Sequence, residues 1–133
     1  MKVGKPEKKI KTLETLHNTN ELKILEQIIL RLSDDSIQVR GEAFNALLLN
    51  QNQISKILID NLNSSDKNIR GFTSLVLANR NEKSAIPEII KLVEDKHGMV
   101  RSCAIGALGH LKAKKIANII LKLLSDSNLE VQK

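Results

Sequence analysis

Apolar residues recur along this chain at the spacing of an amphipathic helix, and the whole pattern returns about every 31 residues. Ile24, Ile28 and Leu32 stand four residues apart, which places their side chains along one stripe of a helix. The same stripe comes back three times, at Ile54, Leu58, Leu62, Ala85, Ile89, Val93, Ile116, Ile120 and Leu124. Each unit is therefore predicted to begin with a helix that buries one apolar face.

A second helix is predicted in each unit from positions counted from one reference residue: Val39, Ile69, Val100 or Val131. In the first three units a small residue follows at +4 (Ala43, Thr73 or Ala104) and another at +7 (Ala46, Val76 or Ala107). A leucine follows at +8 (Leu47, Leu77 or Leu108). Small side chains allow helices to approach closely, while the leucine fills the space beside them. The chain is thus expected to be all-α, built from stacked antiparallel helix pairs.

Polar residues mark the short turn between the two helices of each unit. Position −5 holds Asp34, Ser64, Asp95 or Asp126, whose side chains can accept hydrogen bonds from free backbone N–H groups. Position +1 holds Arg40, Arg70 or Arg101. These residues are expected to form a structural ladder of charge-assisted hydrogen bonds that runs from one unit to the next.

The helix pairs, the Asp at the turn, the Val-Arg pair and the following Ala and Ala-Leu resemble HEAT repeats, in the short form of about 31 residues found in the phycobilin-lyase-like group. The resemblance covers roughly residues 20–133, although Ser64 replaces the Asp of the pattern and Gln132 replaces its Arg. It implies a right-handed α-solenoid whose second helices line the concave side and which serves as a binding scaffold.

Two ends flank the repeats. Residues 1–20 read as a basic tail with a capping helix in which Ile10, Leu13 and Leu16 share one face. Residues 21–133 form the repeat domain, with units at about 21–50, 51–80, 81–111 and 112–133, the last incomplete. The stripe of that last unit would be poorly covered, so either the chain is part of a longer repeat protein or this edge packs on a second copy as a homodimer.

Composition narrows the function. Only 2% of residues are aromatic, there is one cysteine, and nothing resembles a signal peptide or a membrane span, which favours a cytoplasmic helical protein with an aliphatic core. The three histidines lack metal-ligand spacing, and Cys103 is expected to be an inert buried thiol. We therefore expect no cofactor, no metal and no enzymatic activity.

The net charge of +6 lies mostly at the ends: residues 1–11 carry +4 and residues 112–133 carry +3. Between them the chain is nearly neutral, and helical phase places small or apolar residues on the outward side of the second helices. We predict a protein-binding surface there, formed by Phe72, Leu75, Met99, Asn45, Asn68, Gly71, Ser102 and Gly106. The alternative is that packing between neighbouring second helices already buries these positions.

Two functions follow from these patterns. The first is a non-enzymatic scaffold that binds a protein or peptide on the concave face of the second helices. The alternative is a nucleic-acid binder that uses the basic ends, although no Trp or Tyr offers a stacking surface.

Overall fold

The computed structural model describes residues 18–111 and Leu121, and all regular elements in these residues are helical. Their order is α2 (Leu22–Leu30), η1 (Arg31–Ser33), α3 (Ile37–Leu49), α4 (Ser55–Asp60), η2 (Asn61–Asn63), α5 (Lys67–Asn79), η3 (Lys83–Ala85), α6 (Ile86–Lys91), η4 (Leu92–Glu94) and α7 (Gly98–His110). The predicted all-α fold class and the alternation of first and second helices are confirmed for this part of the chain. Most of the predicted fourth unit and the N-terminal helix lie outside the described residues.

The chain divides into two compact units, residues 1–56 and 57–133. In the first unit, α2 packs against α3 and the stripe predicted for the first helix is buried. Leu25 is buried while Ile24 lies at the margin of the stripe. The core of this unit consists of Leu25, Ile28, Ile29, Leu32, Val39, Ala43, Ala46 and Leu47.

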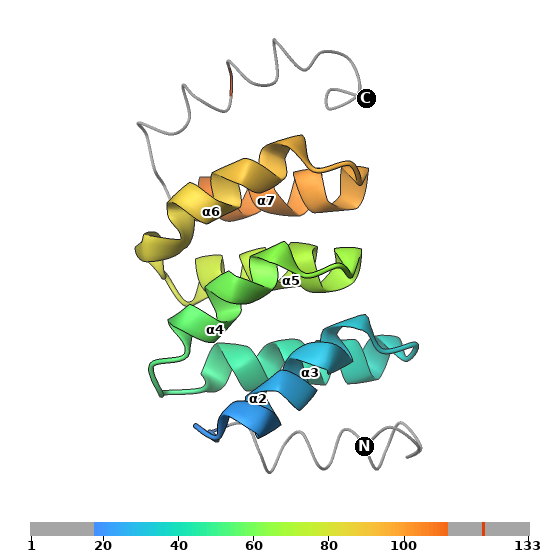
Figure 1. The fold of residues 1–133 in the computed structure, drawn as a ribbon, viewed down its shortest axis with the longest axis vertical. Coiled ribbons are helices and arrows are strands. Elements are labelled where there is room, and N and C mark those ends of the chain that lie inside the picture. Colours follow the sequence, from blue (N-terminus) through green and yellow to red (C-terminus); the bar gives the residue numbers. More distant parts are fainter. Residues whose placement is uncertain (1–17, 112–120, 122–133) are drawn as a thin grey trace. The chain divides into compact units, whose positions relative to one another are not determined.

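The second unit contains two consecutive helix pairs, and α5 and α7 make the largest helix contact within it (Figure 1). Both helices have 13 residues and begin two residues before their reference residue, so equivalent positions lie side by side. Buried aliphatic residues come from all four helices: Leu58, Leu62, Ile69, Val76, Leu77, Ile89, Val93, Val100, Ala104 and Leu108. The +8 leucine of both second helices belongs to this core, as their spacing predicts.

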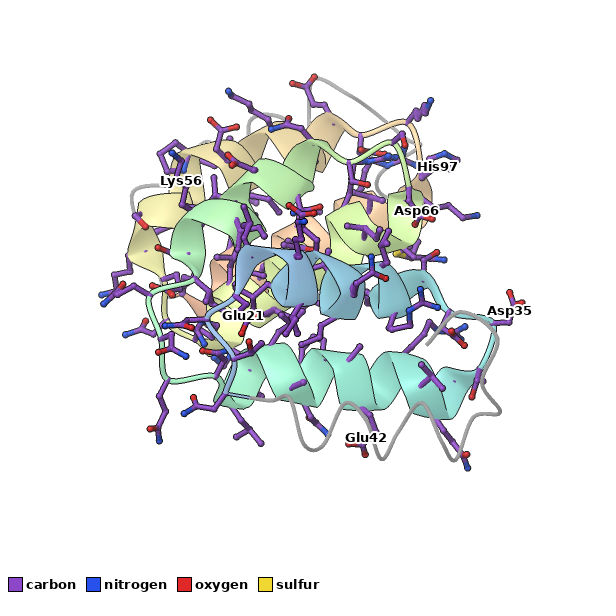
Figure 2. All side chains as sticks on the ribbon, turned by 60° about the horizontal axis from the view of Figure 1, so that its bottom comes forward. Glu21, Asp35, Glu42, Lys56, Asp66 and His97 are labelled. Atoms are coloured by element: carbon purple, nitrogen blue, oxygen red, sulfur yellow. The ribbon has the colours of Figure 1, made fainter. Side chains whose placement is uncertain are left out.

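Each first helix tightens into a 3₁₀ turn before the chain reverses. The side chain at position −5 then accepts from the backbone N–H two residues on, at 2.9 Å for Asp34, 3.1 Å for Ser64 and 2.9 Å for Asp95. The next helix begins immediately afterwards. In Figure 2, Asp66 and His97 mark the starts of α5 and α7 in the second unit, and the Asp66 carboxylate caps α5 by accepting from the N–H groups of Asn68 and Ile69.

The C-terminal end of α5 depends on one residue in the left-handed conformation. Asn81 has φ 58°, the only positive φ among the described residues. The N–H of Glu82 donates to the carbonyl of Leu77 at 3.0 Å, and the N–H of Asn81 donates to the carbonyl of Ala78 at 2.9 Å. These two bonds form a Schellman motif, which satisfies carbonyl groups that the end of a helix leaves free.

Replacement of Asn81 tests this helix end. Asn81→Val should lower the free energy of unfolding by about 1–2 kcal/mol, because a β-branched side chain clashes with the backbone in the left-handed region. Chemical denaturation of both proteins measures this difference. Asn81→Gly is the matched control and should cost nothing, because glycine adopts positive φ freely. Equal stabilities of the Val and Gly variants would contradict a strained position here.

Candidate partner-binding surface

One rung of the predicted ladder joins α5 to the turn that precedes α7. Arg70 donates from Nε to Asp95 Oδ2 at 2.8 Å and from Nη2 to Asp95 Oδ1 at 3.1 Å, a bidentate arrangement. The two side chains are only 9% and 10% exposed. The same guanidinium also donates from Nη1 to the backbone carbonyl of Ser64 at 2.9 Å. Arg70 therefore connects the turn of its own helix pair with the turn of the next.

The pKa of Asp95 reflects this environment. Burial of the carboxyl by itself would raise its pKa, but the hydrogen bond from Arg70, the hydrogen bond from the backbone N–H of His97, and electrostatic interactions, first of all with the Arg70 charge, outweigh burial. The pKa consequently lies below its ordinary value of 3.8. Asp95 is an anion at neutral pH and is matched to a cation, so the pair is suited to holding the fold together.

The other ladder residues mostly act within their own turns. Arg40 donates to the backbone carbonyl of Asp34 at 2.6 Å, and Arg101 donates to that of Asp95 at 2.7 Å. The Asp34 carboxylate is 3.4 Å from Nη1 of Arg31, three residues earlier. Ser64 supplies a hydroxyl and a carbonyl but no carboxylate, and Asp126 lies outside the described residues. All three arginines thus bind the backbone at position −5.

Close approach of α5 and α7 is centred on Gly71. A Cβ atom at Gly71 would lie 2.9 Å from Met99 Sδ and 3.2 Å from Cys103 Sγ, closer than side chains normally approach. The two sulfur atoms are themselves 3.6 Å apart, with the thiol donating to the thioether. Burial raises the pKa of the Cys103 thiol, which keeps it protonated and unreactive. Gly71 is therefore buried in the helix contact and does not form an open floor of the predicted surface.

The remaining residues of the predicted surface differ in exposure. Asn45 on α3 is exposed, and so are Ser102 and Gly106 on α7. Half-buried positions are Asn68, Phe72, Leu75 and Met99. In the second unit the accessible part of the surface therefore lies on α7, and the three large apolar residues contribute only part of their side chains.

Residue spacing did not reveal two features of these turns and helices. The first is the Met99–Cys103 pair that covers Gly71. The sequence carries one sign of it, because the small residue Gly71 at +2 is followed in the next unit by the large Met99 at −1. The Arg31–Asp34 pair was also missed, because the other units have Asn61 and Leu92 where the first has Arg31. Both features depend on single side chains that do not recur in every unit.

The exposed side chains of α7 include neither a carboxylate nor a thiol. Within residues 18–111 and at Leu121, no cluster of three or more His, Cys, Asp or Glu side chains could hold a metal ion. No helix in the same part of the chain is long and apolar enough to cross a membrane. The outward side of α7 instead presents small uncharged residues and exposed backbone.

Comparison with known proteins identifies the repeat. The sequence model of the family described as HEAT repeats matches residues 55–133. The chain belongs to the HEAT repeat family. HEAT repeats stack helix pairs into an α-solenoid, which confirms the predicted fold class, and they commonly serve as protein-interaction scaffolds and are typically non-enzymatic. No curated protein and no solved structure matched the chain.

Arg70→Ala tests the rung of this HEAT protein. At neutral pH we expect the free energy of unfolding to fall by about 1.5–3 kcal/mol, because a buried carboxylate loses its charged partner. A lowered folded-state pKa means that Asp95 stabilises the fold above its ordinary pKa, and that this contribution is lost as pH falls through the folded pKa. The difference between wild type and variant should therefore narrow below about pH 4, measured by urea denaturation across pH.

Lys91→Ala is the control for this measurement. Lys91 pairs with Glu88 at 3.1 Å, but its side chain is 69% exposed. Exposed pairs contribute little, so this variant should stay within about 0.5 kcal/mol of wild type. Equal losses for the two variants, or a loss for Arg70→Ala that does not change with pH, would contradict the assigned role of the rung.

Proposed function

We propose that this HEAT protein is a non-enzymatic scaffold that binds a helical or extended segment of another protein along the outward side of its second helices. Membership of a family whose repeats commonly bind proteins supports the general role. The observation that carries the choice of face is its lack of charge. The exposed residues of α7 are Gly98, Ser102, Gly106, Gly109 and His110, and none is a Lys, Arg, Asp or Glu.

Open glycines support close approach of a partner. A Cβ added at Gly106 or Gly109 would meet no described atom within 4 Å, so packing does not require glycine at either position. Neither residue has positive φ. Glycine inside a helix costs about 0.5–1 kcal/mol relative to alanine. These positions therefore weaken α7 while leaving its backbone accessible, as a surface for a closely packed polypeptide would.

Larger apolar side chains would provide the anchors of this surface. Leu75, Phe72 and Met99 are half-buried, so each exposes part of its side chain while the rest packs in the fold. Partly exposed aromatic and aliphatic groups beside small residues are common at the centres of protein interfaces. In the same unit, Asn68 and Ser102 would supply polar contacts at the margin.

Nucleic-acid binding by the basic ends ranks second. Guanidinium groups of Arg40, Arg70 and Arg101 are used to bind turn carbonyls, which leaves them poorly placed to contact phosphates. The sequence has no Trp or Tyr for base stacking. Binding through the lysines of the ends would be weak and sensitive to salt.

Gly106→Lys tests the proposed face with little risk to the fold. Space is open at Gly106, and lysine is a better helix former than glycine, so the variant should be at least as stable as wild type. An ammonium group buried in the interface should reduce partner capture about tenfold or more, since each tenfold corresponds to about 1.4 kcal/mol. Affinity capture from native lysate at physiological salt, followed by mass spectrometry, measures the loss. Leu75 is less suitable because its half-buried side chain also contributes to packing.

Ser84→Lys is the matched control. Ser84 is exposed in η3, is not part of the proposed surface, and its replacement adds the same charge to the same unit. Capture should persist for this control and should survive nuclease treatment. Undiminished capture by Gly106→Lys would remove the proposed face, whereas loss of capture after nuclease treatment would favour nucleic acid as the partner.

A further inference from the structure

Equivalent sides of α5 and α7 differ in what covers them. On α5, Gly71 at position +2 lies against side chains of α7, and the residues at +5 and +9 on the same side are buried as well. No described helix covers this side of α7, although α7 repeats the length and register of α5. The same three positions of α7 are exposed or half-buried: Ser102, Ile105 and Gly109.

Arg101, next to this side of α7, has an edge without a partner. Its Nη1 donates to the carbonyl of Asp95 at 2.7 Å. Nη1 of Arg70 makes the same bond to Ser64 at 2.9 Å, and Nε and Nη2 of Arg70 bind the Asp95 carboxylate. In the described part of the chain, no group accepts from Nε or Nη2 of Arg101. Because the bond to the carbonyl orients the guanidinium, this edge is positioned to receive a carboxylate in the same bidentate way.

We propose that α7 binds a helix of another protein in the way that α5 binds α7, and that a carboxylate of this partner pairs with the free edge of Arg101. The inference rests on the proposed function, because it concerns the same surface and adds what the partner must carry. The Arg70–Asp95 rung joins the starts of α5 and α7. The partner helix therefore begins beside the start of α7 and runs parallel to it, with its carboxylate in the turn before its first residue.

A second copy of this chain has no suitable carboxylate among its described residues. Such a copy would have to present the −5 side chain of one of its own second helices. The Asp34 side chain is only 4% exposed and lies beside Arg31. Asp95 is already bound to Arg70, and Ser64 has no carboxylate. Charge complementarity therefore favours a different protein as the partner.

The small residues of α7 predict a second property of the partner helix. Met99, at position −1 of the covering helix, has the atom nearest to a Cβ at Gly71. Ser102 has the Cβ that Gly71 lacks, which favours a small side chain at position −1 of the partner. One helical turn further on, the space at Gly106 is open, which favours a large apolar side chain at +3. These partner positions lie four and eight residues after the carboxylate at −5.

Peptide selection on the full-length protein tests the proposal. A phage-displayed library of random peptides, each long enough for about four helical turns, is selected against wild type and against Gly106→Lys. Peptides that bind only the wild type are ligands of this face. We expect them to carry Asp or Glu ahead of a helical sequence, with a small residue four positions later and a large apolar residue eight positions later.

Fluorescence anisotropy with the tightest of these peptides then tests the ion pair. Exchange of the peptide carboxylate for its amide should raise Kd about tenfold, because a charge-assisted bidentate contact is lost. Arg101→Gln should raise Kd by a similar factor, and both changes together should cost no more than either alone. Lys96→Gln is the matched control, since Lys96 is exposed in the same turn, and its Kd should stay within about twofold of wild type.

The outcomes separate this inference from the proposed function. Equal Kd values for the acid and amide peptides, or fully additive losses, overturn the ion pair but leave α7 as a binding surface. The peptide exchange does not alter the protein, so a folding defect in Arg101→Gln cannot imitate its effect. If no peptide distinguishes wild type from Gly106→Lys, the proposed function fails together with the inference.

Two further measurements exclude other occupants of this side of α7. Asp126 lies outside the described residues, and Asp126→Asn should leave the Kd of the peptide unchanged. Tighter peptide binding by this variant would show that a carboxylate of the chain itself occupies Arg101, and would overturn an external partner. Size-exclusion chromatography should give the same oligomeric state with and without peptide. A homodimer that the peptide dissociates would identify a second copy as the occupant, and would equally overturn the proposal.

Discussion

The arginine at position +1 satisfies a requirement shared by the three described turns that join a first helix to a second helix. A short connection between two helices leaves backbone carbonyl and N–H groups without helical partners in a place that water reaches poorly. Arg40, Arg70 and Arg101 bind the carbonyl at position −5, while the side chain at that position binds the backbone N–H two residues on. Both partners of each bond come from the same turn, so helix direction and spacing are set locally.

This requirement also shapes the surface. Three of the few charged residues in α3, α5 and α7 are committed to the turns at the helix starts. The exposed residues of α7 include none of the four fully charged residue types, whereas α5 exposes Lys67 and α3 has a half-buried Glu42. In α7, structural need and surface chemistry are thus separated, with Arg101 near the helix start and the exposed glycines Gly106 and Gly109 further on.

The helix pairs could be predicted from sequence because the buried positions repeat. Leu47, Leu77 and Leu108 are all buried, as their common +8 position predicts. Residue spacing also placed Arg70 and Asp95 at neighbouring turns, and the structure shows them paired. The spacing of apolar residues shows which side of a helix is buried. That side stays apolar in every described unit even where the individual residues differ.

Contacts that depend on individual side chains could not be predicted in the same way. Helical phase points Gly71 away from its own core and so predicts an open position, but phase alone does not show how closely the next helix approaches. The close approach depends on Met99 and Cys103, which have no counterparts in the other units. Gly71 and Gly106 thus look alike in sequence, although one is covered by sulfur atoms and the other is open.

The separation between bonded residues in the turns has a consequence for the order of folding. Each arginine reaches a carbonyl six residues earlier, and each −5 side chain reaches an N–H two residues later. Closing such short loops costs little chain entropy, and topologies rich in local contacts fold quickly. The Arg70–Asp95 rung spans 25 residues and requires two helix pairs. During synthesis, each turn can therefore close as soon as its own residues have emerged. The Arg70–Asp95 ion pair can form only after the next helix pair has been synthesised and has folded.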